Sequence, residues 1–68
     1  MTYKDVDALV DGRTLPISAE NRMGELVIIE RGKGGCGGFY TITTVQRNDW
    51  CRIDTFYENG TITETYEK

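Results

Sequence analysis

The chain has 68 residues, a net charge of −3 and no histidine. A chain of this length forms one domain whose small core leaves little surplus stability, so a partner or a second copy is expected to contribute. Seven aromatic residues and a hydrophobic fraction of 38% exclude a disordered chain.

Charge is distributed unevenly along the chain. Residues 31–52 hold four basic side chains against one acidic side chain, whereas residues 1–30 and 53–68 each carry an excess of three acidic ones. The basic part coincides with a glycine-rich stretch and the β-prone run that follows it.

The first residues lack the apolar core of a signal peptide, and no apolar run approaches the length of a membrane span. We therefore expect a cytoplasmic protein. In a reducing cytosol, Cys36 and Cys51 are expected to remain free thiols.

The N-terminal segment is predicted to form a helix of barely two turns, with Thr2 as N-cap and Gly12 as the stop. Pro16 limits any strand at residues 13–18 to a short edge strand, and the polar residues 19–24 are predicted to form a turn. The apolar residues that share one face of the helix are Tyr3, Val6, Leu9 and Val10.

Three β-prone runs follow residue 24, with turn residues between them and no room for crossover helices. The first of them, residues 26–29, is apolar throughout, so both of its faces are expected to be covered, in a central strand or by a second subunit. A wide glycine-rich hairpin joins it to residues 39–46. We predict a mainly β (small α+β) domain spanning residues 1–68: an antiparallel β-meander of about four strands with one short N-terminal helix.

Two turn signals predict how the later strands align. A tight hairpin at the Asn-Gly pair, residues 59–60, places Tyr57 opposite Ile62, and the same rule at residues 48–49 places Tyr40 opposite Tyr57. The predicted core face then contains Tyr40, Ile42, Cys51, Ile53, Tyr57, Ile62 and Tyr66.

The opposite face of this predicted sheet combines aromatic and basic side chains. If the N-terminal segment covers it, the aromatic rings form a second small core. If it is open, it is an apolar patch edged with positive charge, which is typical of a contact surface. The candidate partner-binding residues on this face are Phe39, Arg47, Trp50, Arg52 and Phe56.

The glycine-rich stretch at residues 31–38 is the most unusual feature of the sequence. Glycines let backbone N–H groups converge on an anion, and Arg31 and Lys33 would favour one. The stretch lacks both the Gly-Lys-Ser/Thr ending and the strand-to-helix turn of nucleotide-binding motifs. Three interpretations of this stretch stay open: a mobile connection, an anion-binding site, and a loop that becomes ordered when a partner binds. The candidate ligand-binding residues are Arg31, Lys33, Gly34, Gly35 and Gly37.

No cofactor, no metal site and no enzyme activity are expected. Structural zinc needs four Cys or His ligands, which only a dimer sharing Cys36 and Cys51 would supply. Histidine, the usual general base near neutral pH, is missing, and the single serine, Ser18, has no identifiable base. Lys33 would activate the Cys36 thiol, but no second catalytic group is evident.

The leading hypothesis is a non-enzymatic inhibitor or adaptor that acts on a macromolecular partner, with a protein as the expected partner. The size and composition suit a phage or mobile-element protein by analogy alone. The alternative is a binder of an anionic small ligand, a nucleotide or single-stranded nucleic acid, although a pI near 4.7 is unusual for a nucleic-acid binder. Self-association, to a homodimer or higher oligomer, is a second prediction, based on the apolar residues 26–29 and an edge strand at residues 61–67.

Overall fold

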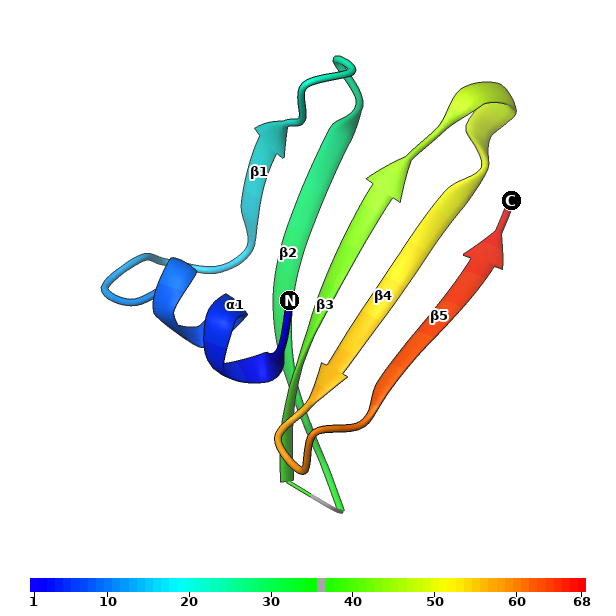
Figure 1. Ribbon diagram of the computed structural model, residues 1–68. Helices are drawn as coiled ribbons and strands as arrows, with labels where there is room; N and C mark the ends of the chain where they lie inside the picture. Colours follow the sequence, from blue (N-terminus) through cyan, green and yellow to red (C-terminus); the bar gives the residue numbers. More distant parts are fainter. Residues whose placement is uncertain (36) are drawn as a thin grey trace.

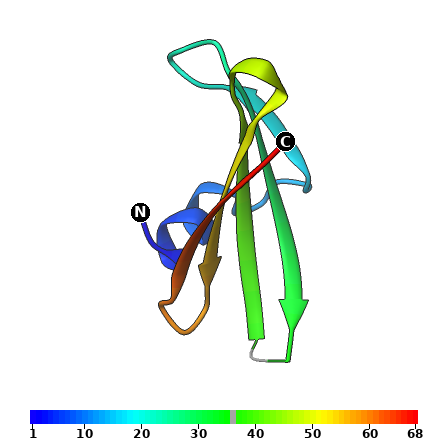
Figure 2. The same ribbon diagram turned by 90° about the vertical axis from the view of Figure 1, so that its right-hand side faces the viewer.

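The computed structural model describes every residue of the chain except residue 36 and confirms a small α+β fold. One helix, α1 (Tyr3–Leu9), precedes five strands that form a single antiparallel sheet in the order β1-β2-β3-β4-β5 (Figure 1). The elements of the sheet are β1 (Ile17–Glu20), β2 (Leu26–Gly34), β3 (Gly37–Val45), β4 (Cys51–Tyr57) and β5 (Ile62–Glu67), with the 3-10 turn η1 (Arg47–Asp49) between β3 and β4. The helix lies on one side of the sheet, and no described element covers the other side (Figure 2).

Helix α1 begins as predicted. The Thr2 hydroxyl accepts a hydrogen bond from the Asp5 backbone N–H at 3.4 Å, and the Asp5 carboxylate accepts one from the Thr2 backbone N–H at 2.8 Å, which is a capping box. Gly12 adopts a left-handed φ of 74° just after the helix. A helix of seven residues is unstable alone, so α1 depends on its packing against the sheet. None of the described helical segments is long and apolar enough to cross a membrane.

Strand β1 follows Pro16 and is the predicted short edge strand. It extends to Glu20, so the prediction of a turn from residue 19 was wrong by two residues. The turn itself is built by Asn21, whose side-chain oxygen accepts hydrogen bonds from the backbone N–H groups of Met23 and Glu25, both at 2.9 Å.

The hairpin between β2 and β3 is narrower than predicted. Both strands continue into the glycine-rich stretch, and Gly34 lies opposite Gly37. Gly32 lies opposite Phe39, and a Cβ built on Gly32 would clash with the Phe39 ring. The missing side chain therefore leaves room for the ring to cover the backbone of the neighbouring strand, which compensates for the weakness of glycine in a sheet.

The predicted alignment of β4 was wrong by one residue on both of its sides. Phe56, not Tyr57, lies opposite both Tyr40 and Ile62. The cause is the length of the two turns: the hydrogen bonds from Gln46 N–H to the Trp50 carbonyl and from Tyr57 N–H to the Thr61 carbonyl each enclose three residues. A three-residue loop shifts the pairing by one position and so reverses the faces of the following strand.

The two shifts cancel for β5, whose side chains point to the predicted sides of the sheet. Only the side chains of β4 point to the sides opposite to those predicted. Of the predicted core face, Cys51, Ile53 and Tyr57 lie on the side away from α1, where Phe39 and Val45 are their neighbours in β3. The residues that share the helix side as predicted are Tyr40, Ile42, Ile62 and Tyr66.

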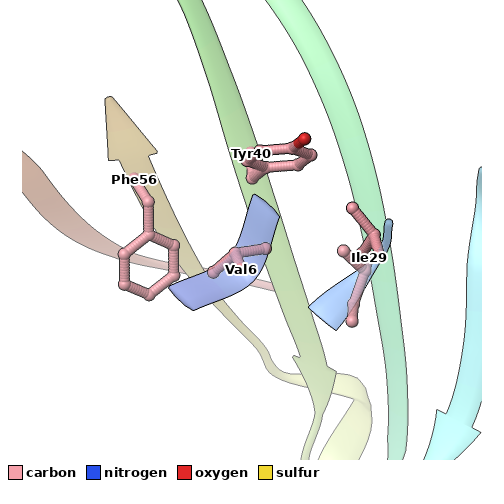
Figure 3. Close-up of a cluster of buried hydrophobic side chains, with 5 residues drawn as sticks. Val6, Ile29, Tyr40 and Phe56 are labelled. Carbon is pink, nitrogen blue, oxygen red and sulfur yellow. The ribbon is translucent and has the colours of Figure 1, made fainter. Parts of the chain in front are cut away.

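The core lies between α1 and the sheet (Figure 3). The side chains buried there are Val6, Val10, Ile29, Tyr40 and Phe56. The expectation that residues 26–29 are covered on both faces was wrong for this chain alone. Strand β2 does lie inside the sheet, between β1 and β3, but Leu26 is 44% exposed and Ile28, on the uncovered side, is only half-buried.

Candidate functional site

The structure does not place the five predicted partner-binding residues on one face. Phe39 lies on the side away from α1, with its ring centroid 5.7 Å from that of Tyr57. Phe56 lies on the helix side and is 7% exposed because α1 packs over it. Trp50 remains 42% exposed. Each of the two interpretations of this face therefore applies to part of it. The N-terminal segment covers Phe56, which belongs to a core, whereas Trp50 stays open to solvent.

A shallow hollow of about 340 Å³ lies at the end of the sheet where β2 begins and β3 ends. It is lined by Trp50 and Tyr66 together with Met23 and Arg47. Met23 is 83%, Tyr66 53% and Trp50 42% exposed. These four residues, from three segments that are far apart in the sequence, are called the Trp50 surface below.

The backbone of Trp50 is held from both sides. Its N–H donates to the Arg47 carbonyl at 3.3 Å and its carbonyl accepts from the Gln46 N–H at 2.6 Å. The turn before it needs two left-handed residues, Asn48 with φ 59° and Asp49 with φ 62°, and these are the non-glycine residue types that best tolerate this region. The backbone position of Trp50 is thus set before any partner arrives.

Basic groups lie beside the Trp50 ring. The Lys68 ammonium nitrogen is 5.8 Å from the ring centroid, a cation–π distance, and Arg47 is exposed on the same hollow. Glu25 and Gln46 complete its lining.

A second hollow, of about 530 Å³, lies on the same side of the sheet, between Met1, which precedes α1, and residues of β3, β4 and β5. Its apolar lining includes Met1 and Ile62, which are 68% and 50% exposed. Its charged lining is an ion cluster in which the Arg52 Nε atom is 3.3 Å from carboxylate oxygens of both Asp54 and Glu64. Asp54 first, and then Glu64, raise the pKa of Arg52, so this guanidinium stays charged.

The two hollows are connected through Tyr66. Its hydroxyl donates to the Glu64 carboxylate at 2.8 Å, a hydrogen bond that raises the pKa of Tyr66. Arg52 is the cross-strand partner of Tyr66. The ion cluster therefore borders the Trp50 surface. Arg52 and Phe56 share the side of Trp50 as predicted, although Phe56 is buried, whereas Phe39 lies on the opposite side.

The predicted ligand-binding residues lie together at the other end of the sheet. Arg31, Lys33 and Gly34 belong to β2, Gly37 to β3, and Gly35 to the connection. Both basic residues, Arg31 and Lys33, are exposed. The predictions for Cys36, as a free thiol, a nucleophile or a shared metal ligand, lie outside the described residues.

The Arg31 guanidinium already has an intramolecular partner. It donates to the Tyr40 hydroxyl at 2.8 Å and lies 5.1 Å from the centroid of the Tyr40 ring. The Tyr40 hydroxyl donates in turn to Asp7 of α1 at 2.5 Å. Sequence reasoning missed this Asp7–Tyr40–Arg31 cluster, because no local pattern pairs residue 7 with residue 40.

Within the described part of the chain, no three carboxylate or thiol groups lie close enough together to hold a metal ion. Comparison with protein-family models, with curated proteins and with solved structures finds no match to this chain. Function is therefore inferred from its surfaces.

Proposed function

We propose that this chain is a small non-enzymatic binding protein that docks on a protein partner through the Trp50 surface. One observation carries the proposal: an exposed Trp, Tyr, Met and Arg, brought from three segments, line one hollow. Trp, Tyr and Arg dominate the binding energy of protein interfaces, and Met is enriched there.

The geometry suits docking without rearrangement. The hydrogen bonds on both sides of Trp50 hold its backbone, so little backbone entropy is lost when a partner covers the ring. A partner that inserts an apolar side chain into the hollow and brings a carboxylate to Arg47 or Lys68 would match it in shape and charge.

A protein of this kind acts by occupying a surface of its partner. We therefore propose the role of an inhibitor, which blocks that surface, or of an adaptor, which connects it to a second protein. Neither role requires a nucleophile or a general base.

The test compares wild-type chain with Trp50→Ala in affinity capture from a lysate of the source organism, followed by calorimetry with the captured protein. Because a buried Trp at the centre of an interface contributes about 2 kcal/mol or more, we expect the dissociation constant to rise by at least about 30-fold. Since Trp50 is outside the core, the melting temperature is expected to change little.

Leu9→Ala is the matched control, because Leu9 is 50% exposed but lies on α1, away from the hollow. It should bind like wild type. A Trp50→Ala variant that melts far below wild type yet binds as tightly would contradict the proposal. A rise in wild-type melting temperature with millimolar nucleotide would favour an anion site instead.

A further inference from the structure

We propose that the sheet side away from α1 is the interface between two copies of this chain, which goes beyond the binding role of the Trp50 surface. Alternate residues of β2, β3 and β4 point to this side, and the six residues of this side that are named next are only half-buried. This open face includes Ile28, Phe39, Thr43, Val45, Ile53 and Tyr57.

The total exposed area of the chain is larger than its mass predicts, and the difference is close to the area that one partner buries in a dimer. Folded monomers of 7.7 kDa expose about 4,300 Å² by the usual scaling with mass. This chain exposes 5029 Å². The excess, about 700 Å², is close to the roughly 800 Å² that each partner buries in a standard interface.

The small size of the core also favours association with a second copy. Among the described residues, only five hydrophobic side chains are buried, and all of them lie between α1 and the sheet. Chains of this length commonly reach adequate stability by adding disulfides, metals or a second subunit. A second sheet stacked on the open face would give the half-buried residues of β2, β3 and β4 a core of their own.

The distribution of charge distinguishes this side from the helix side, which has the Arg52 ion cluster in its middle. No Lys or Arg of the strands lies on the open face, and its acidic residues lie at the margin. Glu20 and Glu67 belong to the edge strands, and Glu30 lies beyond the end of β1, which pairs only with residues 26–29. The uncharged centre suits an identical sheet, since two sheets of the same twist stack face to face.

The test uses the neighbouring residues Thr43 and Thr44, which point to opposite sides of β3. Thr43 lies between Ile28 and Ile53 on the open face, whereas Thr44 lies opposite Arg52 on the helix side. Sedimentation velocity over a concentration series up to the millimolar range would compare wild type with Thr43→Glu and Thr44→Glu. We expect wild type and Thr44→Glu to form dimers, and Thr43→Glu to raise the dissociation constant at least tenfold, roughly, because the carboxylate would be buried between the sheets.

A second readout does not depend on the fold of a variant. In wild-type chain, the methyl resonances of Ile28 and Ile53 should shift with concentration, whereas those of Ile62 on the helix side should not. Salt should strengthen association because it screens the acidic margins. A wild type that stays monomeric, a Thr43→Glu dimer as tight as wild type, or an open face occupied only by a different, basic protein would each overturn the proposal.

Discussion

Tyr40 connects three elements through a single side chain. Its ring packs in the core with a centroid 5.1 Å from that of Tyr3, and its hydroxyl lies between Asp7 of α1 and Arg31 of β2. It is 1% exposed. Because α1 is too short to be stable alone, this partly buried polar contact helps to define where the helix lies on the sheet.

Tyr40→Phe is expected to lower the free energy of unfolding by about 1–2 kcal/mol, because it leaves Asp7 and Arg31 without their shared partner. Tyr66→Phe is the control, since its hydroxyl bonds to Glu64 at the surface and its removal should cost less than about 0.5 kcal/mol. Urea denaturation measures both. Equal losses in the two variants would show that the Tyr40 hydroxyl contributes nothing beyond a surface contact.

The same cluster predicts alkaline sensitivity. Burial, and then the hydrogen bond to Asp7, raise the pKa of Tyr40 above its ordinary 10.0. A raised pKa means that folding favours the neutral phenol, so this contribution is complete below pH 10 and is lost as pH rises through the folded-state pKa. As pH rises from 10 to the folded-state pKa of Tyr40, wild type should lose stability more steeply than Tyr40→Phe in matched urea titrations. Parallel pH profiles would contradict the assignment.

At the scale of elements, the sequence predicts much of this fold. The N-cap at Thr2, the edge strand after Pro16 and the meander all follow from local signals, and the structure confirms them. The alignment of β4 cannot be predicted from local signals. Residues 50–57 have apolar side chains at both odd and even positions, so either set could face the core. The Asn-Asp and Asn-Gly pairs also fit loops of two or three residues, and the longer loop is the one observed.

The residues of the candidate site could also be predicted only in part from the sequence. Trp50 and Arg47 were predicted as contact residues, and they line the hollow. Met23 was not singled out, and Tyr66 was assigned to the core. Their approach to Trp50 depends on how the β1–β2 turn and β5 come together across the sheet, which no local pattern encodes.

The three-residue loop at residues 58–60 can be tested through Gly60, whose φ is 97°. We expect Gly60→Ala to lower the free energy of unfolding by about 1–2 kcal/mol, because this backbone conformation is strained for any residue with a Cβ. Gly35→Ala is the control, since no atom lies within 4 Å of its added Cβ and no left-handed φ is found there. Thermal unfolding would report the difference, and a Gly60→Ala variant as stable as Gly35→Ala would argue against this loop.

For the molecule as a whole, the sheet separates two surfaces with different properties. The Cα atoms of the molecule extend over 33 × 24 × 17 Å, and the seven-residue helix covers only part of one side of the sheet. The Trp50 surface lies on the helix side and the uncharged open face lies on the other, so a dimer through the open face would leave both Trp50 surfaces free. Both proposals depend on which side of β4 faces α1.

The orientation of β4 can be measured through Val6, which is fully buried at the centre of α1. An isotope-edited nuclear Overhauser spectrum would report which aromatic ring its methyl groups touch. The structure places Phe56 in the same buried cluster as Val6 (Figure 3). Tyr57, the next residue of β4, points to the opposite side of the sheet. Cross-peaks from Val6 to Phe56 are therefore expected. Cross-peaks from Val6 to Tyr57 in place of Phe56 would contradict the account, because they would return Ile53 and Tyr57 to the core and abolish the open face.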